Sequence, residues 1–389
     1  MKKVLALVLA IVMVFGMVAC GSSASNDGPS ATNDSPSSNA DAQGSNEKEP
    51  LSIMMYVIQS LGTLSCEDLI YEEVVKFCEE TGSTLNTFEC NSDETAHETN
   101  LREIAGSGAY DIIITGYWSI PEYVQMIANE YPEQKWLIFD TEIDYTQPNT
   151  GNIASFTAEQ NTLAFMAGVL AAKMTTADYK GINDDKVVSW VGGGENTAVN
   201  DFLVGFIDGV NYVDSSIEVL YSYVGDWANS AKAKELALTH FDMGADVCFT
   251  VCGGAGFGAC EAAYETGHYA FGVDTDFAAT LTAAGSATAE NVVTSAIKQF
   301  GYIIYDALVA AYDGTLEWGV HTNHGVSTGY LEMIETSQFN TIVKEGMPEE
   351  YKEYVQIVAD LEAGKIEVGT AVGATEEYVN QKKAEAAPF

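Results

Sequence analysis

From residue 51 onward, the sequence alternates short apolar segments with longer segments that carry apolar residues at helical spacing. The short segments are typical of buried strands, and the longer ones are typical of helices that cover a sheet. Because parallel strands need such crossover helices, the alternation predicts an α/β protein with parallel sheets. Strands are expected at residues 51–58, 84–88, 110–114, 135–139, 186–191, 217–223, 246–251 and 269–273. Helices are expected at residues 67–80, 94–105, 121–129, 158–173, 199–210, 231–242 and 259–266.

These expected strands fall into two groups, one on each side of the helix at 158–173. Thr157 and Gln160 have the spacing of a capping box at the start of that helix. No long linker separates the groups. The pattern therefore predicts two doubly wound parallel-sheet lobes in tandem, an arrangement that forms a cleft.

The first 20 residues have the features of an export signal. Lys2 and Lys3 precede an uncharged, mostly apolar run that ends at Ala19 and Cys20. This run is too short for a membrane-spanning helix, which needs about 20 residues, and it is typical of a signal peptide. A small residue directly before a single cysteine resembles the bacterial lipobox, which implies that Cys20 is acylated. An ordinary cleaved signal is the alternative.

Residues 21–50 contain no aromatic residue and no aliphatic residue larger than alanine. Such a segment cannot bury enough apolar surface to offset the entropy of ordering it. We therefore expect a signal peptide at 1–19 and a lipid-anchored flexible tether at 20–50. Together they predict a protein held at the extracytoplasmic face of a bacterial cell membrane.

The formal net charge of −39 excludes two classes of partner. Nucleic acid phosphates and anionic lipid surfaces would both be repelled by so acidic a protein. The remaining six cysteines include no C-x-x-C pair, so neither a zinc knuckle nor a thioredoxin-type motif is present. We expect mostly buried free thiols, no metal and no cofactor.

Ligands of open parallel sheets bind outside the carboxyl ends of the strands. Four expected strand ends carry distinctive residues: Tyr117 with Trp118, Trp227, Gly253 with Gly254, and Asp274 with Asp276. They offer aromatic faces, free backbone N–H groups and carboxylates. This set suits a neutral, hydroxyl-rich ligand with a flat ring.

A series of dispersed motifs lies between about residues 50 and 370. They read GNIAS at 151–155, AGVLAAK at 167–173, GFIDGV at 205–210, YVGDW at 223–227, KELA at 234–237, GADV at 244–247 and GVDTD at 272–276. In kind and order these motifs resemble the basic membrane protein (BMP) family of lipoproteins, which includes the PnrA-like purine nucleoside receptors.

The resemblance implies a type I periplasmic-binding-protein fold, whose two lobes are joined by a hinge of crossing strands, and an ABC importer as partner. We expect residues 51–156 and about 290–328 in the N-terminal lobe. Residues 157–289 and about 329–389 are expected in the C-terminal lobe. Hinge bending is expected near 155–157, 287–290 and 328–330. The expected protein is a monomeric binding protein without catalytic residues.

By the same likeness, Asp274 binds ribose hydroxyls, the backbone of Gly253 and Gly254 meets the sugar, and Lys298 reaches the ligand. Trp227 stands where the family often has Phe, so stacking on a base is retained. A purine nucleoside is therefore the expected ligand.

The N-terminal lobe departs from the family pattern of an acidic residue followed by Ser-Phe-Asn. Thr63 takes the acidic position, Cys66 that of the stacking Phe, and Glu67 that of the Asn. This change alters one face of the expected aromatic sandwich. The aromatic residues expected to compensate are Tyr56, Tyr117 and Trp118.

Three alternatives stay open. In the first, the ligand is another hydroxylated small molecule, such as a sugar. In the second, the protein signals its bound state to a membrane sensor instead of a permease. The third is a nucleoside hydrolase in which Asp274, with Asp276 or Glu67, supplies acid and base.

Overall fold

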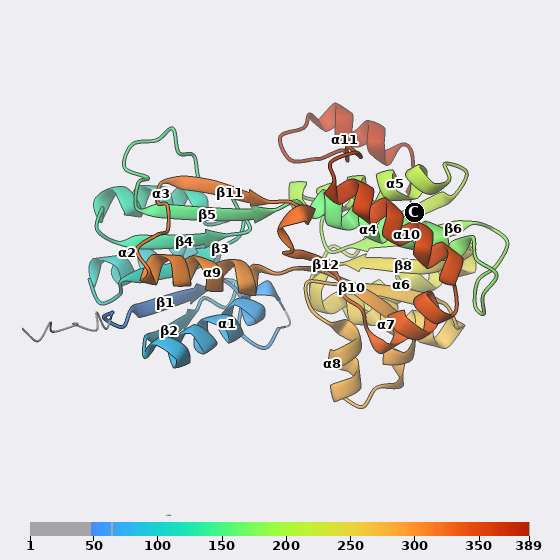
Figure 1. Ribbon diagram of the computed structural model, residues 1–389, viewed down its shortest axis with the longest axis horizontal. Helices are drawn as coiled ribbons and strands as arrows, with labels where there is room; N and C mark the ends of the chain where they lie inside the picture. Colours follow the sequence, from blue (N-terminus) through green and yellow to red (C-terminus); the bar gives the residue numbers. More distant parts are fainter. Residues whose placement is uncertain (1–47, 64, 389) are drawn as a thin grey trace, which may run out of the picture. The chain divides into compact units, whose positions relative to one another are not determined.

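Two β-sheets, each covered by helices on both faces, form the frame of the protein (Figure 1). The structure is a computed structural model that describes residues 48–63 and 65–388. The expected signal peptide, Cys20 and most of the expected tether lie outside the described residues. None of the helices in the described part of the chain is long and apolar enough to cross a membrane.

The first sheet has six parallel strands in the order β11-β5-β4-β3-β1-β2. The strands are β1 Ser52–Val57, β2 Thr84–Glu89, β3 Ile112–Gly116, β4 Lys135–Phe139, β5 Ile153–Ala158 and β11 Val320–His324. Helices α1 (Cys66–Thr81) and α9 (Phe300–Tyr312) share the core on one face, and α2 (His97–Gly106) and α3 (Pro121–Glu130) share the core on the other. We call this unit the first lobe.

The second sheet has seven strands in the order β12-β10-β9-β8-β6-β7-β13, and only β12 is antiparallel to its neighbour. The strands are β6 Val187–Gly192, β7 Glu218–Tyr223, β8 Ala245–Val251, β9 Tyr269–Val273, β10 Val292–Lys298, β12 Leu331–Met333 and β13 Ala387–Pro388. The helices of this second lobe are α4 Gln160–Thr175, α5 Thr197–Val213, α6 Ser230–Asp242, α7 Phe257–Thr266, α8 Phe277–Ala283, α10 Pro348–Glu362 and α11 Glu376–Lys383.

Helices α4 and α5 pack with their backbones in direct contact. A Cβ atom at Gly209 would lie 2.2 Å from the carbonyl oxygen of Phe165, and one at Gly205 would lie 2.0 Å from that of Asn161. Neither position has room for a side chain. Because α4 is apolar on nearly all sides, it is almost completely buried, as expected for a helix without a polar face.

The capping box expected at Thr157 and Gln160 is wrong. Thr157 lies within β5, where it pairs with Asn323 of β11, and α4 begins at Gln160 after Glu159. Sheet pairing therefore keeps Thr157 in the first lobe, two residues before Glu159, the N-cap of α4.

The chain passes between the lobes in three places: after β5, after β10, and between β11 and β12. The boundary expected near residue 290 is wrong, since β10 pairs with β9 in the second sheet and the chain crosses only after Lys298. Residues 287–290, expected as a hinge, lie in a short 3₁₀ helix, Ala287–Asn291, that packs against α7 and α8 within the second lobe.

Candidate functional site

Three residues with left-handed backbone mark the carboxyl ends of the strands. Tyr117 follows β3, Asp140 follows β4 and Asp274 follows β9, with φ angles of 68°, 54° and 62°. This conformation is costly for residues other than glycine, and it clusters at functional sites. In parallel sheets, ligands bind beside the carboxyl ends of the strands. These three residues therefore lie at the carboxyl ends of the strands, where the sequence predicts ligand binding.

A buried ion pair joins the strand ends of the two lobes. The ammonium of Lys298, at the end of β10, lies 2.7 Å from Asp140 Oδ1 and 3.2 Å from Gln160 Oε1. Lys298 is 5% exposed. The pKa of Lys298 is raised. Burial alone would lower it, but the negative charges of Asp140 and Asp274 oppose that effect, and the net shift is upward. Lys298 is therefore a fixed positive charge at the centre of this region.

Asp274 provides a carboxylate that is free for a ligand. Its backbone N–H donates to the carbonyl oxygen of Ala296 at 3.0 Å, which fixes the residue at the strand end. Within the described residues, no hydrogen bond reaches its carboxylate. Burial raises the pKa of Asp274, an effect that Lys298 opposes and Asp140 reinforces. Asp274 is thus an acceptor with unused capacity beside a cation.

The ring of Trp227 lies against the backbone of a neighbouring strand end. A Cβ atom at Gly193 would lie 2.5 Å from Cε3 and Cζ3 of this ring, and one at Gly253 would lie 3.8 Å from Cε3. Trp227 nevertheless remains 47% exposed. The indole therefore has one side supported by glycine backbone and an accessible surface left for a flat ligand.

Gly253 and Gly254 open a short 3₁₀ helix, Gly253–Gly256, that leads into α7. Gly253 has a φ of 55°, and the N–H of Ala255 donates to the carbonyl oxygen of Trp227 at 2.9 Å. This bond ties the glycine loop to the Trp227 loop. Four adjacent strands of the second sheet, in the order β9, β8, β6 and β7, each end next to a residue of this region. In the same order these residues are Asp274, Gly253, Gly193 and Trp227.

In the first lobe, Cys66 and Tyr117 form a pair. Their Sγ and OH atoms lie 3.1 Å apart, and Cys66 is close enough to Asp140, Asp274 and Lys298 for their charges to act on it. Burial raises the pKa of the Cys66 thiol well above its usual value. The thiol is therefore neutral, and Tyr117 is the aromatic residue next to it.

Tyr56 does not compensate for the missing phenylalanine. Its ring is fully buried in the core shared with α2 and α3, where its hydroxyl lies 3.1 Å from Cys90 Sγ and 3.0 Å from His97 Nδ1. Successive residues of a strand point to opposite faces of the sheet, and Tyr56 points away from α1. Trp118 is 71% exposed and lies outside the buried cluster.

Two of the expected site carboxylates already have structural hydrogen bonds. Glu67 is fully buried and accepts from the N–H groups of Ile58 at 2.6 Å and Gln59 at 3.2 Å, so it fixes the loop after β1. Burial raises the pKa of Glu67 to about 7, although these bonds oppose the shift. Asp276 is the N-cap of α8 and accepts from the N–H of Ala279 at 2.9 Å.

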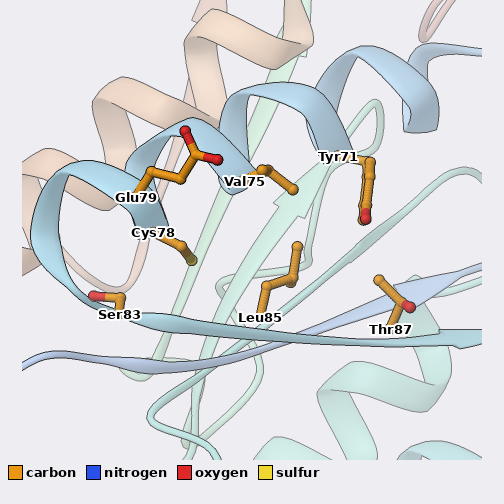
Figure 2. Close-up of a pocket in the computed structure, with 7 residues that line it drawn as sticks. All are labelled: Tyr71, Val75, Cys78, Glu79, Ser83, Leu85 and Thr87. Atoms are coloured by element: carbon orange, nitrogen blue, oxygen red, sulfur yellow. The ribbon is translucent and has the colours of Figure 1, made fainter. Parts of the chain in front are cut away.

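A cavity of about 300 Å³ lies elsewhere, between α1 and the edge strand β2 (Figure 2). Seven residues line it: Tyr71, Val75, Cys78, Glu79, Ser83, Leu85 and Thr87. None of them is an expected ligand residue. The groove is a surface feature of the first lobe, whereas the strand ends bring the charged and aromatic groups together.

The six cysteines of the described chain are free thiols, and all except Cys78 are buried, as predicted. Within residues 48–63 and 65–388, no group of three or more His, Cys, Asp or Glu side chains is placed to hold a metal ion. Two polar residues of the site, Asp140 and Gln160, were not expected from the sequence. Asp140 directly follows an expected strand, so the rule that found Asp274 applies to it as well.

A family model described as ABC transporter substrate-binding protein, PnrA-like, matches residues 51–361 of the chain. The CD4+ T-cell-stimulating antigen of Listeria monocytogenes is 24% identical over 374 residues, which are 92% of this chain and 97% of the relative. The ABC transporter nucleoside-binding protein BmpA of Lactococcus lactis is 24% identical over 262 residues, 65% of this chain and 71% of the relative.

Among solved structures, an ABC transporter solute-binding protein from Aeropyrum pernix has a TM-score of 0.73 with 18% identity, covering 86% of this chain and 98% of its own. One from Conexibacter woesei has a TM-score of 0.64 with 15% identity, covering 82% and 99%. These likenesses confirm the predicted fold class.

Proposed function

The chain belongs to the family of PnrA-like ABC transporter substrate-binding proteins, and on this premise we propose that it captures a purine nucleoside for import. Membership makes it a binding protein and not an enzyme. It also indicates a small-molecule ligand and the permease subunits of an ABC transporter as partners. The hydrolase alternative is therefore dropped.

The arrangement of Trp227, Gly253 and Asp274 at neighbouring strand ends carries the proposal. An indole supported by Gly193 offers a stacking surface for a base, and base–aromatic stacking contributes on the order of 1–3 kcal/mol. The Asp274 carboxylate, free of other hydrogen bonds within the described chain, accepts from ribose hydroxyls. A sugar alone uses the carboxylate but has no flat aromatic ring to stack on the indole. A nucleoside uses both.

The ion pair between Lys298 and Asp140 supports binding by closure of the two lobes. One partner comes from each lobe, and Lys298 is almost inaccessible while the pair is formed. A ligand reaches Asp274 and Lys298 when the lobes move apart and is enclosed when they return. The permease then recognises the closed form.

The N-terminal region supplies the second part of the proposal. We propose acylation at Cys20 after removal of residues 1–19, with the following residues as a tether to the outer face of a bacterial cell membrane. The folded part acts as a monomer. Replacing Cys20 with Ser should move the protein from the membrane fraction to the soluble fraction, whereas membrane retention would contradict the anchor.

Thermal shift measurements and calorimetry with inosine, guanosine and adenosine test the ligand. Binding to the folded state alone raises stability by about 2.7 kcal/mol at a hundredfold excess over Kd, enough for a clear rise in Tm. Hypoxanthine, ribose, glucose and myo-inositol serve as controls that carry only one half of the recognition. We expect the nucleosides to give the largest rise. A rise with a free sugar and none with any nucleoside would reject the nucleoside and retain the family.

A further inference from the structure

The last part of the chain, beyond the end of the family match at residue 361, docks onto α5 of the second lobe. Two carboxylates of α5 hold it. Asp208 accepts from the N–H of Gly369 at 2.8 Å and from the ammonium of Lys382 at 2.7 Å. Strand β13, which belongs to this last part of the chain, pairs with β7 at the edge of the second sheet. We call residues 366–388 the C-terminal segment.

Asp201 is the second carboxylate and is only 2% exposed. Its Oδ1 accepts from the hydroxyl of Thr370 and from the N–H of Ala371, both at 2.7 Å. The side chain of Gln160 also lies close enough to favour the charged form of the Asp201 carboxylate. A buried carboxylate is stable only when it is well hydrogen-bonded, and here the C-terminal segment supplies two of those bonds.

Gln160 connects Asp201 with the ligand site. Its Oε1 accepts from the ammonium of Lys298 at 3.2 Å, and its amide group lies beside the Asp201 carboxylate. Asp201 can only accept and Lys298 can only donate, so the amide has one possible orientation. Gln160 is 7% exposed, so water does not compete for these bonds.

We propose, building on the function proposed above, that Gln160 and Asp201 are positioning residues for Lys298, and that the C-terminal segment holds them in place. Side-chain contacts thus run from Thr370 through Asp201 and Gln160 to Lys298. When a ligand separates Lys298 from Asp140, Gln160 is the acceptor that keeps the ammonium in the site. The C-terminal segment thus belongs to the binding machinery.

The first test needs no ligand and observes the Lys298 ammonium by ¹⁵N NMR. A buried, hydrogen-bonded ammonium gives its own signal, which is assigned by its loss in Lys298→Met. We expect Gln160→Met and Thr370→Val to shift this signal, although Thr370 does not touch Lys298. Lys382→Met is the matched control, because it removes a contact between the same segment and α5 that lies far along the chain from Thr370. An unmoved signal in Thr370→Val, or an equal shift in Lys382→Met, overturns the proposal.

The second test is a double-mutant cycle in the Kd for inosine. We expect Gln160→Met to weaken binding about tenfold, the scale of a hydrogen bond to a charged group, and Thr370→Val about threefold. In the Lys298→Met background, Gln160→Met should have no further effect. An equal loss in both backgrounds refutes a role through Lys298. If the unmodified protein binds no nucleoside, the proposed ligand fails, while the NMR result still decides this inference.

Discussion

Replacing Gly193 with Ala tests whether the supported face of Trp227 matters for ligand binding. The new Cβ would lie 2.5 Å from two ring atoms, closer than any real contact, so the indole must move. Because Trp227 is 47% exposed, the ring can swing outward without disturbing the core. Gly193 has no left-handed backbone, so Ala itself introduces no strain there. The perturbation therefore acts on the stacking surface and leaves the fold intact.

The magnitude follows from stacking. If the base rests on Trp227, displacement of the ring removes up to about 1–3 kcal/mol of binding energy. The Kd for inosine should therefore rise about tenfold by calorimetry, while the unfolding free energy changes by less than about 1 kcal/mol.

Gly194→Ala is the matched control. Its Cβ would lie 3.8 Å from Trp227 Cζ2, which is an ordinary contact, so we expect unchanged binding. Trp227→Ala should weaken binding as much as Gly193→Ala, and the double variant should be no weaker than either. Tight inosine binding by Gly193→Ala, or an equal loss in Gly194→Ala, would refute the stacking argument.

Three further changes test the site and the core. Asp274→Asn should weaken inosine binding about tenfold or more, as expected for bonds to a charged acceptor, with a much smaller effect on 2′,3′-dideoxyinosine in the same calorimeter. Glu67 has a folded-state pKa of about 7 against an ordinary 4.5, so its favourable contribution is complete below pH 4.5 and is lost as the pH rises through 7. Relative to Glu67→Gln, the unfolding free energy should fall by about 3 kcal/mol between pH 4.5 and 8 in urea titrations, and parallel pH profiles would contradict this. Gly209→Ala should cost at least about 2 kcal/mol in the same urea assay because its Cβ would meet the Phe165 carbonyl, whereas Gly151→Ala, which meets nothing within 4 Å, should be neutral.

The eight expected strands are all present. Six of them, β1, β3, β4, β6, β8 and β9, are buried on both faces and therefore have nearly continuous apolar sequences, whereas β7 is half-buried and the edge strand β2 is mostly exposed. Strands β5 and β10 were missed since Ser155, Thr157, Thr294 and Ser295 interrupt their apolar pattern. The sequence placed Asp274 correctly at a strand end. The contact of Gln160 with Lys298 depends on how α4 packs against the end of β10. Sequence periodicity and spacing carry no information on this packing.

Both sheets are completed by strands from late in the chain. The first sheet needs β11 at residues 320–324 to pair with β5, and the edge of the second is added by β13 at 387–388. Neither sheet can complete its strand pairing while the ribosome is still making the first 300 or so residues. Such pairings between distant parts of the chain also form slowly. The nascent chain therefore stays open until these later residues have been made, a state that chaperones are able to engage.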